Sequence, residues 1–270
     1  MDWGRAKNIL IILLAALNLI LAAALFNRMA GGGAERELYA GVARILDARG
    51  VQILCDFPKQ VKNSGLLIYG DGVRFTESCA RSLGGAEAPG SVEMLGRESL
   101  KYTNGQPGEL FDTTTPAAAD AETRQFLASL GIDISGFRTD YIAENTDSGY
   151  NIQYVLDYKG SLVFDSRVEV VIDGGGGVTE IAISYRDIKS TSPDQLMDVI
   201  PAYQVVLKNY VEGGAAIESI DIGFMGQNTA RDNPFIESEE GAVWRVRLAD
   251  GSVRFFEATY GDEIFMYAPA

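Results

Sequence analysis

The feature that most constrains this chain is a run of apolar residues close to its N-terminus. Residues 9–26 form an 18-residue segment in which Asn18 is the single polar side chain. As an α-helix, this segment would be about 27 Å long, close to the thickness of the hydrocarbon layer of a bilayer. The run therefore predicts a transmembrane helix, preceded by a short tail at residues 1–8.

A cleaved signal peptide is the alternative interpretation of this run. Signal peptides usually have a shorter apolar region, and residues 27–31 match a cleavage site poorly. We therefore favour a retained anchor. Basic residues lie on both sides of the run, so their number does not set its orientation. A short basic tail before the first apolar helix is typical of a signal anchor, which predicts a single-pass protein of the cell membrane with a cytoplasmic N-terminus and an extracytoplasmic C-terminal domain.

One face of the predicted membrane helix carries Ala15, Asn18 and Ala22, at spacings i, i+3 and i+7. Small residues let two helices approach closely, and an amide in lipid requires a hydrogen-bonding partner. These three residues are our candidates for partner binding, as a docking face for another transmembrane helix. An ordinary anchor that tolerates one asparagine is the alternative, and the sequence does not decide between the two.

Composition excludes several functions. The chain has 270 residues and a net charge of −14, so it should repel phosphate backbones, and we expect no nucleic-acid partner. It contains no histidine, which excludes a Ser-His-Asp triad and every zinc site that needs imidazole. The two cysteines, Cys55 and Cys79, are too few for a four-cysteine metal site. They could form a disulfide outside the cytoplasm, or Cys55 could be a small core residue.

No motif of catalysis is present. The glycine run at residues 174–177 lies between two predicted strands, so it predicts a hairpin turn and not a phosphate-binding loop. Asp221 and Asp232 are candidate calcium ligands without a calcium-loop motif. Three aromatic residues could contact a ligand, although sheet core is their commoner role: Trp244, Phe256 and Tyr260. The sequence thus predicts a protein that is not an enzyme and that has no cofactor or metal.

The rest of the chain predicts an α+β fold of antiparallel sheets with helices packed on one face. A Gly-rich linker at residues 27–34 would join the anchor to an N-terminal lobe at residues 35–116. A helix followed by a four-strand meander is then predicted twice, over residues 117–190 and 191–270.

Local signals place the start of the second of these units. Ser192-Pro193-Asp194-Gln195 matches a capping box, so a helix should begin there and be kinked at Pro201. Asp250-Gly251 predicts a type I′ turn between two later strands.

The first eleven residues, Met1-Asp2-Trp3-Gly4-Arg5-Ala6-Lys7-Asn8-Ile9-Leu10-Ile11, resemble the start of the YycI (WalI) proteins. In that family, a Met-Asp-Trp tail with two basic residues runs straight into one transmembrane helix. The rest of the chain resembles the family more loosely, at residues 102–105, 110–111, 162–165, 178–181 and 243–246. The Ala/Gly-rich composition, the few lysines and Gly4 depart from the family pattern, as in a distant member.

The resemblance implies a regulator. YycI-like proteins sit in the membrane of Gram-positive-type bacteria beside a companion, YycH. Together they modulate the sensor histidine kinase WalK (YycG) of a two-component system that controls cell-wall metabolism. The implied partners are therefore a WalK-like kinase and a YycH-like companion, with the outer domains pairing as homo- or heterodimers. The alternatives are an extracytoplasmic module that binds a peptide, lipid or wall fragment and, with less support, an anchored carboxylate hydrolase.

Overall fold

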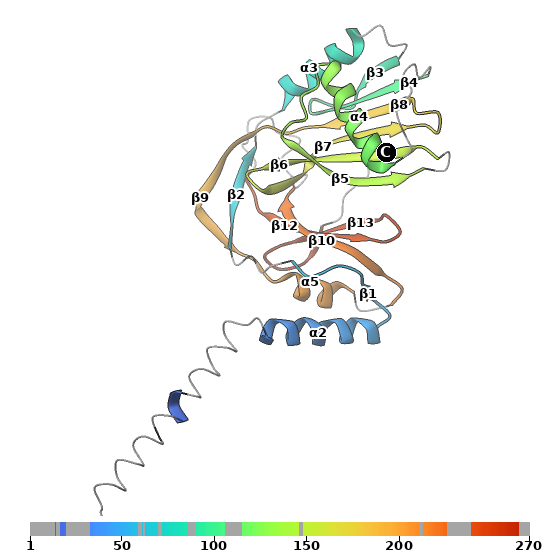
Figure 1. Ribbon diagram of the computed structural model, residues 1–270. Helices are drawn as coiled ribbons and strands as arrows, with labels where there is room; N and C mark the ends of the chain where they lie inside the picture. Colours follow the sequence, from blue (N-terminus) through green and yellow to red (C-terminus); the bar gives the residue numbers. More distant parts are fainter. Residues whose placement is uncertain are drawn as a thin grey trace, which may run out of the picture.

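Figure 1 shows the computed structural model of the protein, which describes Leu14 and residues 17–19, 33–58, 61, 63–69, 72–85, 90–105, 115–145, 148–210, 213–225 and 239–264. Most of the predicted membrane helix therefore lies outside the described residues, together with the tail at residues 1–8 and most of the linker. Leu14 and residues 17–19 are helical. Across the described ranges, no helix is both long and apolar enough to cross a membrane.

The described residues form an α+β fold. The helices are α2 (Gly33–Ala48), α3 (Val73–Gly85), α4 (Pro116–Ser129) and α5 (Ala202–Asn209). The strands are β1 (Gln52–Ile53), β2 (Asn63–Tyr69), β3 (Gly90–Met94), β4 (Ser99–Asn104), β5 (Phe137–Glu144), β6 (Tyr150–Tyr158), β7 (Ser161–Ile172), β8 (Val178–Ser184), β9 (Ile188–Asp198), β10 (Ala216–Phe224), β11 (Glu239–Glu240), β12 (Ala242–Leu248), β13 (Val253–Glu257) and β14 (Glu263–Ile264).

Most of the strands belong to one large sheet. Its path is β14-β13-β12-β10-β7-β8-β4-β3, with β6 pairing β7, β5 pairing β6 and β1 pairing β10. Neighbouring strands are antiparallel except for the short β1–β10 and β10–β7 pairings. A smaller sheet in the order β11-β2-β9 forms a ribbon along one side (Figure 1). The α+β class and the antiparallel character of the sheet are therefore confirmed.

The large sheet has two halves that lie one above the other in Figure 1. The α4 half contains α3, α4 and β3–β8, and the α5 half contains α2, α5, β1, β10 and β12–β14. A helix followed by antiparallel strands occurs in both, as α4 before β5–β8 and as α5 before β10 and β12–β14. Each half buries its own apolar cluster, and a third cluster, which includes Phe164, Val243 and Phe255, joins strands of both halves.

Alternating apolar residues explain how the strands of the α4 half bury one face in a core. Val168, Val170 and Ile172 share one face of β7 and are fully buried, as expected for a strand with one face on a core. The helix α4 begins after Thr115, whose Oγ1 accepts a hydrogen bond from the Ala118 N–H at 3.2 Å. Leu127 is among the α4 residues buried against this sheet.

The segment predicted as an N-terminal lobe, residues 35–116, is shared between the two halves. Its first part joins the α5 half, because α2 packs beside α5 and β1 pairs β10. Its later part joins the α4 half, because β4 pairs β8 and β3 pairs β4. This partition corrects the expected lobe, and its cause is long-range strand pairing, which local periodicity does not encode.

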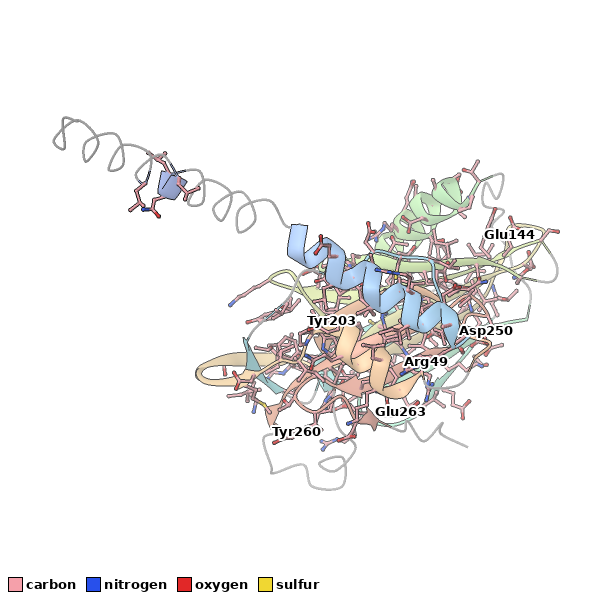
Figure 2. The ribbon with its side chains drawn as sticks, turned by 90° about the horizontal axis from the view of Figure 1, so that it is seen from below. Arg49, Glu144, Tyr203, Asp250, Tyr260 and Glu263 are labelled. Carbon is pink, nitrogen blue, oxygen red and sulfur yellow. The ribbon has the colours of Figure 1, made fainter. Side chains whose placement is uncertain are left out.

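A close backbone contact holds the end of α2 against the segment after α5. A Cβ atom at Gly213 would lie 2.4 Å from the Arg49 carbonyl oxygen, so only glycine allows this approach. The Gly214 N–H donates to the Gly50 carbonyl at 3.0 Å, and Arg49 Nη1 donates to the Leu207 carbonyl at 2.9 Å. Figure 2 shows α2 lying across α5, with Arg49 near this contact.

The predicted helix starting near Ser192 is wrong. Residues 188–198 form strand β9 at the edge of the small sheet, and α5 begins only at Ala202, with Pro201 as its N-cap. Pro193 is tolerated there because edge strands accept proline, and its register with β2 shifts between Ser64 and Leu66. Pro201 therefore precedes the helix instead of kinking it.

Two further local predictions have definite outcomes. Both cysteines are free thiols, with Cys79 buried in the α4 half and Cys55 packed against the core of the α5 half, so the disulfide interpretation is wrong.

The turn at Asp250-Gly251 is not type I′, because Gly251 has a φ of 84° while Asp250 is not among the described residues with positive φ. The glycine run does form the β7–β8 turn, in which Asp173 Oδ1 accepts from the Gly175 and Gly177 N–H groups.

Candidate functional site: an arginine cluster between the two halves

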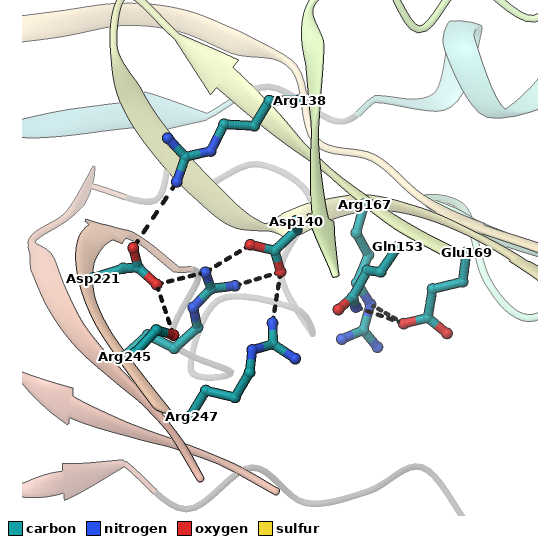
Figure 3. Close-up of polar contacts among 9 residues, drawn as sticks. Arg138, Asp140, Gln153, Arg167, Glu169, Asp221, Arg245 and Arg247 are labelled. Carbon is teal, nitrogen blue, oxygen red and sulfur yellow. Dashed lines mark hydrogen bonds and ion pairs between the residues drawn. The ribbon is translucent and has the colours of Figure 1, made fainter. Parts of the chain in front are cut away.

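The candidate site begins with the alternation of side chains along β12. Trp244 and Val246 point to one face of the strand and are fully buried in the core of the α5 half. Trp244 Nε1 donates to the Ile200 carbonyl at 2.9 Å, which fixes that face toward the α5 segment. Arg245 and Arg247 must then share the opposite face, because side chains two residues apart in a strand lie on the same side. This face is covered by strands of the α4 half (Figure 3).

Asp140 on β5 pairs with both of these arginines across the junction (Figure 3). Arg245 Nη1 and Nη2 donate to the two Asp140 carboxylate oxygens at 2.7 Å each, and Arg247 Nη2 donates to Oδ2 at 2.8 Å. The side chains are almost fully removed from solvent, with 4% of Asp140 and 6% of Arg245 exposed. A planar guanidinium matches a carboxylate in this two-bond geometry, which fixes orientation as well as charge.

Asp221 and Arg138 extend the group on its other side. Asp221 lies directly opposite Arg245 in the β10–β12 register and accepts a hydrogen bond from Arg245 Nη2 at 2.8 Å. Arg138 of β5 forms a longer ion pair with Asp221, at 3.9 Å. We call these five residues the junction cluster: Arg138, Asp140, Asp221, Arg245 and Arg247. Its members come from β5 in the α4 half and from β10 and β12 in the α5 half.

The electrostatics of the junction cluster favour a charged Arg245. Burial lowers the pKa of Arg245, but hydrogen bonds and charge from Asp140 and then Asp221 outweigh burial, so its pKa lies above the usual value. Aromatic rings add to this stabilisation, since the Arg245 guanidinium lies 4.5 Å from the Phe164 ring centre and that of Arg247 lies 4.5 Å from the Tyr141 ring centre. Arg245 therefore carries its positive charge at every physiological pH.

A cavity of about 140 Å³ adjoins the junction cluster. Its polar lining residues are Asp140, Gln153, Arg167, Arg245 and Arg247. Its apolar lining residues are Val155, Phe164, Val253 and Phe255. Three arginines and one carboxylate therefore line a cavity in a protein whose overall charge is −14. Such an arrangement can hold an anion, because guanidinium groups match carboxylates and phosphates.

Arg167 of β7 lies at the more exposed part of this lining. It pairs with Glu169 at 3.4 Å, and Gln153 Nε2 donates to the same Glu169 oxygen at 2.8 Å. The Arg167 side chain is 42% exposed, unlike the buried arginines of β12. The lining therefore includes one largely exposed arginine, Arg167, and two buried arginines of the junction cluster.

The residues singled out from the sequence lie in different environments in the structure. Ala15 and Ala22 lie outside the described residues, and Asn18 is helical and exposed. Trp244 and Phe256 are buried in the sheet core, as their commoner role predicts, whereas Tyr260 is 67% exposed. Asp232 lies outside the described residues and Asp221 pairs with Arg245, and the described part of the chain holds no group of three or more side chains suited to a metal.

Sequence reasoning did not identify Asp140, Arg245 or Arg247 as site residues. The sequence Trp244-Arg245-Val246-Arg247 contains a usable signal, because two arginines alternate with two large apolar residues in a predicted strand. That pattern predicts that the arginines share a face. It does not predict that β5 covers this face with a carboxylate.

Comparison with known proteins adds a distant likeness of fold. No family model matches the sequence, and no curated protein is similar to it. Among solved structures, the C-terminal domain of YpeB from Bacillus megaterium is similar with a TM-score of 0.39 and 10% sequence identity. The likeness covers 70% of this chain and 94% of that domain.

Proposed function

We propose that this chain is a membrane-anchored accessory protein that modulates a sensor histidine kinase through protein–protein contacts. The proposal places residues 9–26 in the membrane, residues 1–8 in the cytoplasm and the α+β domain outside the cell. The partners would be a WalK-like kinase and a YycH-like companion, as the resemblance of the N-terminus to YycI proteins implies. No bond-breaking step is required for this role.

The observation that carries the proposal is the attachment of α2 to the folded domain. This helix begins at Gly33, seven residues after the end of the predicted membrane helix. Val42 and Leu46 are buried on its inner face, and the Arg49 and Gly213 contacts hold its C-terminal end. Because α2 is fixed to the domain, the anchor and its Gly-rich linker would hold the whole domain, and not α2 alone, beside a partner bound in the membrane.

The junction cluster supports the same role because it links the two halves. Buried charge pairs have strict geometric requirements, so they favour one relative arrangement of β5 and β12 over others. A domain with one preferred arrangement presents one defined surface to a neighbouring protein. A coupling of about 1–3 kcal/mol between such an accessory protein and a kinase would change signalling about 5- to 150-fold.

The decisive experiment alters the predicted docking face. Asn18→Leu removes the amide from that face, and we expect it to weaken co-purification with the kinase and to shift phosphoryl transfer to the response regulator several-fold. Asn18→Gln, which keeps an amide, is the matched control and should preserve part of both readouts. A second variant exchanges residues 9–26 for an unrelated transmembrane helix. Unchanged kinase output and co-purification in Asn18→Leu and in the exchanged chain would contradict helix docking.

A further inference from the structure

The cavity beside the junction cluster contains hydrogen-bond donors that no described residue uses. Arg247 donates through Nη2 to Asp140, and its Nε and Nη1 have no acceptor within the described part of the chain. Arg167 contacts Glu169 through Nε, which leaves its two terminal amino groups without a described acceptor. Arg245 Nε is buried and also lacks a hydrogen bond to any described residue. Arg245 Nε is costly because it is buried without an acceptor, and an anion in the cavity could accept hydrogen bonds from it and from the free groups of Arg247 and Arg167.

The charge around the cavity fits a ligand with one negative charge. The junction cluster and the Arg167–Glu169 pair together contain four arginines and three carboxylates. Asp140, which lines the cavity, and Asp221, which pairs with the lining residue Arg245, are already engaged by arginines at 2.7–2.8 Å. The excess of one positive charge can therefore be balanced by a single carboxylate, whereas a doubly charged phosphate would leave a net negative charge in a partly buried site.

The remaining walls and the size define the rest of the ligand. Phe164, Phe255, Val155 and Val253 offer an apolar surface beside the guanidinium groups. Pockets for drug-sized ligands are typically about 300–1,000 Å³, so a cavity of about 140 Å³ admits only a few heavy atoms. A ligand with a polar head and a short apolar tail would satisfy both parts of the lining.

We propose that this cavity binds a small organic monocarboxylate. Its carboxylate accepts hydrogen bonds from Arg247 and Arg167, and its short apolar tail packs against Phe164 and Phe255. Because the lining comes from β5–β7 of one half and β12–β13 of the other, a bound ligand contacts both halves. This site is independent of the proposed action on a kinase, and either could exist without the other.

Calorimetric titration of the full-length chain, purified in a mild detergent, tests the proposal with sodium butyrate as the probe. Butyramide has the same tail without the charge, and inorganic phosphate has charge without a tail. We expect butyrate to bind, butyramide not to bind, and phosphate to bind more weakly than butyrate. Absence of butyrate binding at tens of millimolar, or phosphate binding as tight as butyrate, would overturn the assignment.

Variants locate the binding in this cavity. Arg167→Gln should weaken butyrate binding about tenfold, the usual effect of losing a charge-assisted hydrogen bond. Arg254→Gln is the matched control, because Arg254 is similarly exposed on β13 and pairs with Glu263, yet does not line the cavity. It should leave the dissociation constant within about twofold, since no direct contact is lost. Arg247→Gln should also weaken butyrate binding. An unchanged far-UV circular dichroism spectrum would show that this variant still folds. Equal butyrate affinity in Arg167→Gln, Arg247→Gln and the unmodified chain would contradict the proposal.

Discussion

Replacing Asp140 with alanine should destabilise the protein far more than replacing an aspartate of an exposed ion pair. Asp140 accepts three hydrogen bonds from Arg245 and Arg247, at 2.7, 2.7 and 2.8 Å, and its side chain is 4% exposed. Among the described residues, the Asp140→Ala variant would leave Arg247 without a carboxylate partner and Arg245 with only Asp221. Removing one partner of a buried ion pair costs about 3–5 kcal/mol, because the other charge remains buried.

Asp262→Ala provides the matched control. Asp262 pairs with Lys208 at 2.6 Å, but its side chain is 68% exposed. Exposed pairs contribute about 0–1 kcal/mol, since water solvates the separated charges. At about 2–4 °C per kcal/mol for a domain of this size, Asp140→Ala should lower Tm by about 6–20 °C, and Asp262→Ala by at most about 4 °C.

The measurement is thermal unfolding followed by far-UV circular dichroism, together with urea titration to obtain the free energy of unfolding. Asp140→Asn extends the series, because the amide keeps the shape and one acceptor oxygen but loses the charge. Its decrease in the free energy of unfolding should therefore lie between those of Asp140→Ala and Asp262→Ala. If Asp140→Ala and Asp262→Ala lowered the free energy of unfolding equally, the junction cluster would contribute no more than a surface pair, and the reasoning would be refuted.

Two further predictions concern the thiols and the contact of α2. Burial raises the pKa of the Cys79 thiol to about 11, so about one thiolate in a thousand is present at pH 8, and iodoacetamide should modify Cys79 only after unfolding or as the pH is raised toward 11. The half-buried Cys55 should react first, and a disulfide found by mass mapping without reductant would contradict both expectations. Gly213→Ala should destabilise the chain, because its Cβ would lie 2.4 Å from the Arg49 carbonyl oxygen, whereas Gly41→Ala in α2 meets no atom within 4 Å and should stabilise by about 0.5–1 kcal/mol. Equal urea midpoints for these two variants would show that the contact is not tight.

The candidate site was predictable from the sequence only in part. The alternation in Trp244-Arg245-Val246-Arg247 indicates which residues share a face, because a strand has a period of two. The role of that face depends on Asp140, 105 residues away from Arg245 in the chain. Nothing in the residues around Arg245 specifies that partner, since an ion pair is selected by the packing of two distant strands.

The sequence by itself determined the elements that depend on local period and local turns. The helix and four antiparallel strands predicted within residues 117–190 are observed as α4 and β5–β8, and the glycine run after Asp173 was predicted as a turn. Only the tertiary structure decided that Ser192-Pro193-Asp194-Gln195 lies in a strand. A capping box offers about 1 kcal/mol to a helix, and the cross-strand pairing of β9 with β2 outweighs it. Tertiary structure likewise divided residues 35–116 between two halves and buried Arg245 between them, because pairing between distant strands is a property of the whole fold.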